Sequence, residues 1–84
     1  MDKKELAIQA KAIKPFTQIG AKGVTDGAIE KILLYLKKHK LGKIKLLDSA
    51  LDSKDKKEVA QELVTRTKAT LISQIGKTVV LWKR

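Results

Sequence analysis

An amphipathic segment in the first half of the sequence constrains the fold most strongly. Its apolar residues recur with the spacing of one helical face: Ile29, Ile32, Leu33 and Leu36. Thr25 is a suitable N-cap, and Asp26 follows in the first turn, where the helix dipole favours a negative charge. Cations at 37–40 suit the opposite end, and Gly42 is expected to close the turn. Such a stripe must be covered by other elements, which predicts a layered fold.

Shorter patterns on either side of this helix predict the elements that cover it. Residues 2–13 form a predicted helix that ends before Pro15, because the residue preceding a proline avoids the helical region. Residues 16–19 then form a brief strand. After the central helix, residues 43–46 alternate charged and apolar side chains, which is the pattern of a half-buried strand.

A third helix is predicted in the second half of the chain. A loop at 48–52 precedes it, and Asp52 or Ser53 is expected to supply its N-cap. The helix ends near Thr67, and its inward face consists of Val59, Ala60, Leu63 and Thr67.

Two strands complete the predicted fold. Residues 70–75 and 78–82 flank Gly76-Lys77, a two-residue hairpin signal. Because residues 79–82 are all apolar, the last strand is expected to lie centrally or to be covered on both faces. The predicted order is α-β-α-β-α-β-β. It describes a single two-layer α/β domain over residues 1–84, with helices packed on a mixed four-stranded sheet.

The charge balance points to a polyanionic partner. Nineteen basic residues, seventeen of them lysines, oppose nine acidic ones and leave a net charge of +10. Residues 1–45 carry most of this excess, with eleven lysines against four acidic residues. A field of this sign concentrates nucleic acid near the surface. The alternative is a solvated lysine surface that keeps a small protein soluble.

Several classes of function are not expected. The chain has no cysteine, which excludes disulfides and thiolate chemistry. It has no apolar run of about eighteen residues that would span a membrane, and its first five residues lack the apolar core of a signal peptide. We therefore expect a cytoplasmic protein. His39 has no second histidine or cysteine beside it, so we expect no metal site. We also expect no cofactor, no small-molecule substrate and no enzymatic activity.

The candidate functional motif is a G-x-x-G loop, Gly20-Ala21-Lys22-Gly23, between a predicted strand and the N-cap Thr25. Two glycines remove side chains that would keep a phosphate away from the backbone. The helix start directs unpaired N–H groups and partial positive charge toward the loop, and Lys22 adds a full charge. This combination predicts contact with a sugar-phosphate backbone. The alternative is a tight turn that requires two residues with positive φ.

Two segments resemble a known family. Residues 15–27, PFTQIGAKGVTDG, look like the signature of the CRM domain (chloroplast RNA splicing and ribosome maturation), and residues 74–83, QIGKTVVLWK, look like its closing hairpin. The resemblance covers nearly the whole chain in register. It implies a fold similar to the C-terminal domain of translation initiation factor 3, a KH-like GxxG loop and RNA binding. Stand-alone members of that family associate with large-subunit ribosomal precursors.

Carried over to this chain, the resemblance places the family's loop at Gly20 to Gly23 and its helix cap at Thr25. Two positions depart from the family pattern. The basic residue that commonly follows the first loop glycine is replaced by Ala21, and the charge lies on Lys22 instead. A glycine often found after the third helix is replaced by Lys68. If this position is left-handed, the replacement costs about 1 kcal/mol.

Further basic and aromatic residues are weaker candidates. Lys11 and Lys14 precede the loop strand and are expected to extend the positive surface beside the loop. A second basic cluster comprises Lys37, Lys38, Lys40, Lys43 and Lys45, although helix-dipole complementation and an exposed strand face also explain it. Trp82 and Tyr35 suit packing in the core, with stacking on bases as the alternative.

These observations lead to one principal hypothesis and two alternatives. The principal hypothesis is a monomeric, non-catalytic RNA-binding domain that contacts ribosomal RNA precursors through their backbone, during assembly of the large subunit. A basic protein-interaction module that docks on acidic partners is the first alternative. A duplex DNA-binding architectural protein is the second.

Overall fold

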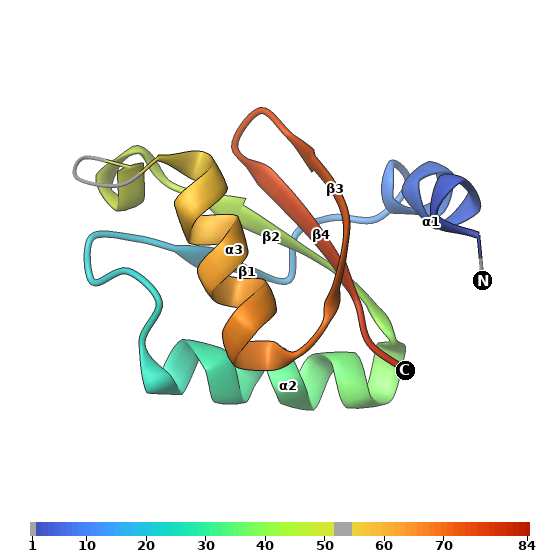
Figure 1. Ribbon diagram of the computed structural model, residues 1–84, viewed down its shortest axis with the longest axis horizontal. Helices are drawn as coiled ribbons and strands as arrows, with labels where there is room; N and C mark the ends of the chain where they lie inside the picture. The colour runs from blue at the N-terminus through green and yellow to red at the C-terminus, as the bar shows by residue number, and fades with distance from the viewer. Residues whose placement is uncertain (1, 52–54) are drawn as a thin grey trace.

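The computed structural model describes residues 2–51 and 55–84 and confirms the predicted α/β fold (Figure 1). Along these residues the elements follow the predicted order, with one short 3-10 helix added: α1 (Lys3–Ala10), β1 (Thr17–Ile19), α2 (Asp26–His39), β2 (Leu41–Leu46), η1 (Asp48–Leu51), α3 (Lys56–Thr67), β3 (Thr70–Ile75) and β4 (Thr78–Trp82).

The four strands form one mixed sheet in the order β1-β2-β4-β3. β1 is parallel to β2, and Thr17 lies opposite Ile44. The other two pairs, β2 with β4 and β3 with β4, are antiparallel. β4 therefore has a hydrogen-bonded neighbour on each side, which confirms the central position predicted from its run of apolar residues.

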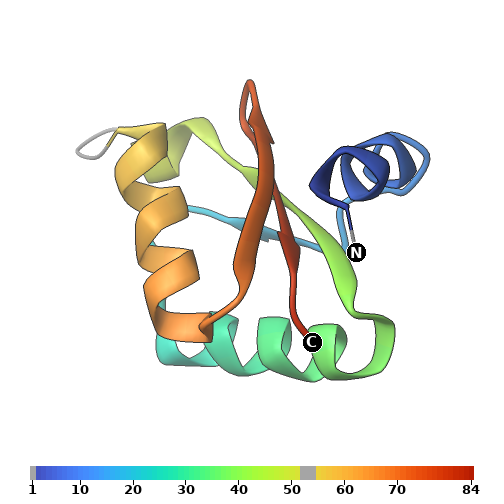
Figure 2. The same ribbon diagram turned by 45° about the vertical axis from the view of Figure 1, so that its right-hand side comes forward.

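Helices α2 and α3 cover one face of the sheet and enclose the main core. The core side chains come from both helices and from β1, β2 and β4, with Leu71 of β3 packed against them. The most deeply buried are Ile19, Ile32, Leu36, Ile44, Leu46, Leu63, Val79 and Leu81. α1 lies on the opposite face, as Figure 2 shows. There it contacts β2 and β3, and Leu6, Ala10 and Val80 are buried outside the main core. Part of the sheet is thus covered on both faces.

The first helix ends three residues earlier than predicted. α1 spans Lys3–Ala10, with the Asp2 side chain accepting a hydrogen bond from the Lys4 amide at 3.0 Å as its N-cap. Beyond Ala10, the amides of residues 11, 12 and 13 each bond the carbonyl three residues back, at 3.1 to 3.4 Å. This tighter pattern is common at helix ends and leads the chain into Pro15.

The prediction that Gly42 closes the turn after the central helix was wrong. Lys40 makes that turn with φ of 69°, and Gly42 is a buried residue inside β2. A Cβ atom on Gly42 would lie 2.7 Å from Cε1 of Phe16 and 3.1 Å from Cδ2 of Leu36. The Phe16 ring in turn stacks on Tyr35, with centroids 3.8 Å apart. Glycine is required here by close packing rather than by backbone conformation.

Two further expectations concern the chain between β2 and β3. The segment at 48–51 is a 3-10 helix, η1, rather than a loop. The proposed caps Asp52 and Ser53 lie outside the described residues, and α3 begins at Lys56 after Asp55. Lys68 follows α3 with φ of 60°, so it adopts the left-handed conformation. This is the conformation to which the glycine often found there in the family is suited.

Replacing Gly42 by alanine should destabilise the fold, because the new methyl group must displace the ring of Phe16 or the side chain of Leu36. We expect the free energy of unfolding to fall by about 1 to 3 kcal/mol in chemical denaturation. Gly27→Ala is the matched control, since Gly27 is helical and a Cβ there meets no atom closer than 4.0 Å. That variant should be unchanged or more stable by up to about 1 kcal/mol. Equal stability of the two variants would contradict the packing role of Gly42.

Candidate nucleic-acid interface

The loop at 20–23 is a tight turn at the surface, between the end of β1 and the start of α2. The Gly23 amide donates to the Gly20 carbonyl at 2.9 Å, and Gly23 has φ of 71°. Ala21 and Lys22 occupy the two corners of the turn and are exposed. The turn projects at the far end of β1 from α1 (Figure 1).

The two loop glycines serve different purposes. Gly23 is left-handed, a conformation that side chains rarely adopt, so the turn itself explains why glycine stands there. Gly20 does not have a positive φ, and a Cβ on it would make only ordinary contacts, 3.5 Å to Leu47 and 3.8 Å to Ser49. The turn therefore does not require glycine at position 20. What its absent side chain provides is open access to the backbone.

Several amides around the turn have no acceptor among the described residues. They are the N–H groups of residues 21 and 22 in the turn, of 24 and 25 after it, and of 26 and 27 at the start of α2. The next two helical amides are satisfied by Thr25, whose hydroxyl accepts from Ala28 at 3.1 Å and whose carbonyl accepts from Ile29 at 3.0 Å. Thr25 is thus the N-cap that the sequence predicted. Unpaired amides beside a lysine are donors suited to an anion.

A hollow of about 240 Å³ opens beside the turn. Residues 21–24 form one wall, while η1 and α3 supply the other through Ser49, Ala50, Val59 and Glu62. The turn is therefore not packed into the interior, and a ligand can approach it from the side of the hollow as well as from outside.

Arg66, near the end of α3, fixes the segment that joins the turn to α2. Its guanidinium donates to the Val24 carbonyl and to the Asp26 carboxylate, and it lies 3.6 Å from the Glu62 carboxylate. The two carboxylates on either side of the turn are both paired with this one cation, which reduces their repulsion of an anionic ligand. No local pattern in the sequence points to Arg66, because 42 residues separate it from Val24.

A second ion pair lies on the η1 side of the turn. Lys77, in the β3–β4 hairpin, donates to the Asp48 carboxylate. This hydrogen bond and the positive charge of Lys77, with a smaller contribution from Lys45, hold the pKa of Asp48 below its usual 3.8. The carboxylate consequently stays ionised and paired to a lower pH than an isolated aspartate would.

Lys11 and Lys14, which were expected beside the loop, lie elsewhere. Lys14 lines a hollow at the free edge of β1 together with Lys31 and Lys45, at the opposite end of the strand from the turn. Lys11 lies on the sheet face that α1 partly covers, near Lys43. The structure therefore brings Gly20 to Gly23 and Thr25 together but separates both lysines from them.

The lysines of the second basic cluster lie at two separate places, and the two aromatic residues are packed against other parts of the protein. Lys37, Lys38 and Lys40 are exposed at the end of α2, whereas Lys43 and Lys45 project from the sheet face opposite the main core. Tyr35 stacks between Phe16 and His39, with centroids at 3.8 and 4.3 Å, and Trp82 is half-buried in β4. These positions favour packing over base stacking for both aromatic residues.

Among the described residues no three His, Cys, Asp or Glu side chains lie close enough together to bind a metal ion. Within the same residues, no helix has the length and apolar character needed to cross a membrane.

Comparison with known proteins gives consistent matches over almost the whole chain. The sequence model of the CRS1/YhbY (CRM) domain matches residues 1–83. The chain is 35% identical over 81 residues to the probable RNA-binding protein YqeI of Bacillus subtilis (strain 168), a match covering 96% of this chain and 82% of YqeI. The solution structure of SAV1595 from Staphylococcus aureus, described as a candidate RNA-binding protein, superposes with a TM-score of 0.82 at 33% identity. That match covers 98% of this chain and 83% of SAV1595.

Arg66→Ala should loosen the turn, because Val24 and Asp26 lose their shared partner. We expect the Gly23 amide to exchange with solvent several times faster, measured by NMR hydrogen exchange. The free energy of unfolding should fall by only about 1 to 2 kcal/mol, since the pair is partly exposed. Arg66→Lys keeps the charge but cannot donate in the same two directions, so it should behave like the alanine variant. Unchanged exchange at Gly23 in both variants would show that Arg66 does not order the turn.

Proposed function

The chain belongs to the CRS1/YhbY (CRM) domain family, and from this membership we propose that it is an RNA-binding protein that contacts the RNA backbone at the turn Gly20 to Gly23. The names of YqeI and SAV1595 both refer to RNA binding, which supports RNA rather than DNA or protein as the partner. The net charge of +10 suits a polyanion.

The observation that carries the proposal for the turn is its set of unpaired backbone donors. Six of the seven amides in residues 21–27 have no acceptor among the described residues, and the exposed Lys22 lies among them. Backbone N–H groups at a helix start bind phosphate oxygens without reference to base identity. Gly20 leaves the backbone accessible, and Arg66 pairs with the carboxylates on both sides, which weakens their repulsion of a phosphate. In this proposal Lys22 takes the place of the basic residue that the family commonly has at position 21.

We further propose that the bound RNA is a ribosomal RNA precursor and that the protein acts in assembly of the large subunit. The family resemblance of residues 15–27 and 74–83 supports this part. Recognition would rest on backbone contacts and RNA shape, in a monomeric, cytoplasmic protein without catalytic activity.

Gly20→Asp should abolish RNA binding, because a carboxylate would be placed against the phosphate. Gly20 does not need a positive φ and has room for a Cβ, so the melting temperature should change by no more than a few degrees. The charge-matched control is Gln61→Glu, which alters an exposed residue of α3 and should bind nearly as well as the wild type. For the wild type, neutralising about four phosphates predicts a slope of log K against log salt of about −3 on single strands.

Fluorescence anisotropy with labelled RNA measures the binding affinity of each variant. Repeating it at several salt concentrations gives the slope of log K against log salt. Binding that is insensitive to salt would exclude the phosphate mechanism. Gly20→Asp binding as tightly as Gln61→Glu would exclude the turn as the contact site.

Crosslinking in cell lysate followed by sequencing of the attached RNA should recover large-subunit ribosomal precursors. The Gly20→Asp variant, expressed at the same level, should lose this enrichment, while Gln61→Glu should retain it. Recovery of messenger or transfer RNA in place of ribosomal sequences would refute the assignment to ribosome assembly but not RNA binding itself.

A further inference from the structure

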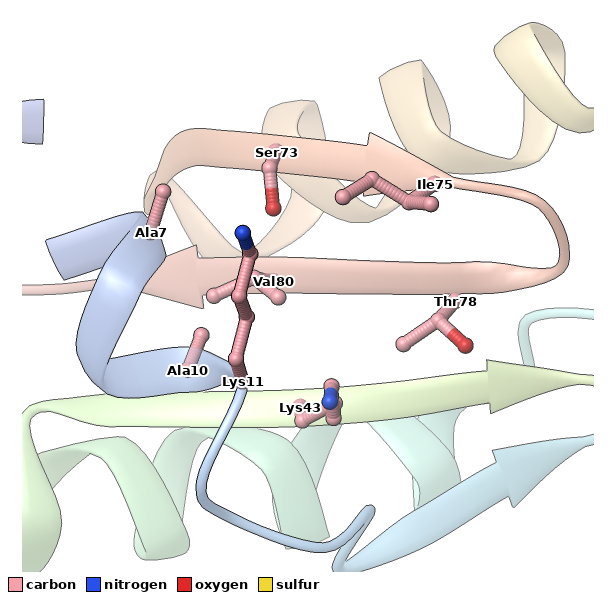
Figure 3. A pocket seen from close by; sticks show the side chains of 8 residues that line it. All are labelled: Ala7, Ala10, Lys11, Lys43, Ser73, Ile75, Thr78 and Val80. Carbon is pink, nitrogen blue, oxygen red and sulfur yellow. The ribbon is translucent and has the colours of Figure 1, made fainter. Parts of the chain in front are cut away.

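An open groove lies on the sheet face that α1 only partly covers (Figure 3). Its volume is about 310 Å³. Ala7 and Ala10 of α1 form one side, and Val80 and Ile75 form an apolar floor on β4 and β3. Ile75 is 67% exposed and, unlike the similarly exposed Ile8 and Leu34, it lines this groove.

The rim of the groove is cationic. Lys11 and Lys43 line it, and no carboxylate is among its lining residues. Lys45 lies two residues further along β2 and projects from the same face. The hydroxyl groups of Ser73 and Thr78 also line the groove and supply polar groups close to the floor. An apolar floor with hydroxyls and a positive rim suits a ligand that carries flat apolar faces flanked by negative charge.

The strand register connects this groove to the turn at 20–23. Gln18 of β1 lies opposite Lys45 of β2, Lys45 lies opposite Thr78 of β4, and Thr78 lies opposite Ile75 of β3. One cross-strand row therefore leads from the strand that precedes Gly20 directly to the groove. Three steps between neighbouring strands span about 14 Å. The turn begins two residues beyond Gln18, so an RNA strand that binds there must cross this row and also the end of β1.

We propose that the groove receives unpaired bases of the RNA strand whose backbone binds at Gly20 to Gly23. The inference rests on the proposed function and extends it by naming the form of RNA, single-stranded rather than duplex. The bases contact Ile75, Ser73 and Thr78 above the buried Val80, while Lys11, Lys43 and Lys45 contact the phosphates between them. Bases that are paired in a duplex cannot reach the floor, so the groove discriminates between the two forms.

The test uses Ile75→Asp, which adds a charge to the groove floor at an exposed position. Leu34→Asp is its matched control, because Leu34 is 70% exposed and lies on α2, on the other side of the sheet. Dissociation constants are measured at one salt concentration for a single-stranded oligouridylate and for an RNA duplex of equal length. Wild type and Leu34→Asp should prefer the single strand. Ile75→Asp should bind it about fivefold to tenfold more weakly, with duplex binding equal to that of the control.

The outcomes separate this inference from the proposed function. Ile75→Asp and Leu34→Asp could bind the single strand with equal dissociation constants while Gly20→Asp loses binding. That result would refute base binding in the groove and support backbone binding at the turn. If Ile75→Asp weakens binding and Gly20→Asp does not, the groove binds RNA without the turn, and both the turn and the proposal that the groove receives the strand held there are refuted. In NMR spectra, oligouridylate should shift the amides of Ser73, Ile75 and Thr78. Shifts produced there by an acidic apolar peptide but not by oligouridylate would assign the groove to a protein partner and overturn the inference.

Discussion

The parallel pairing of β1 with β2 is the constraint on which the candidate site depends. Parallel neighbours cannot be joined by a tight turn, so the chain must return along a crossover, which here is the 14-residue helix α2. The end of β1 and the start of α2 are thereby forced together at one end of the sheet. The turn Gly20 to Gly23 is the link between them. Its closeness to the unpaired amides of a helix start thus follows from the topology and not from the loop sequence alone.

Both ends of this crossover depend on contacts between residues far apart in the sequence. Where the chain enters β2 after α2, Gly42 has no Cβ, and this allows the side chains of Phe16 and Leu36 to pack closely against the strand. A Cβ at this position would clash with them. At the loop end, Arg66 reaches from α3 to Val24 and Asp26 and so couples the turn to the third helix. The turn is left exposed, but the segment that follows it is not free to move independently. A ligand that binds there meets donors whose positions are already set, which reduces the entropy lost on binding.

The two faces of the sheet have different roles in the proposed mode of RNA binding. Helices α2 and α3 cover one face and enclose the main core together with the strands. The other face carries Lys43 and Lys45 beside Val80 and is covered only in part, because α1 ends at Ala10. In the proposed mode of binding, backbone contacts at the turn position the RNA, and unpaired bases are received on the half-covered face. Contacts to phosphates position a nucleic acid, whereas contacts to bases distinguish one form or sequence from another.

The sequence by itself determined the features that arise from residues close together in the chain. These include the stripe and Thr25 cap of α2, the apolar strand β4 and the placement of the G-x-x-G turn between a strand and a helix. Helical periodicity, caps and turns are local, so a single sequence carries them. Only the tertiary structure decided the strand order, the packing role of Gly42, the pairing of Arg66 with Val24 and Asp26, and the separation of Lys11 and Lys14 from the turn. Those arrangements depend on which distant surfaces are buried against one another, and no local pattern of residues specifies that.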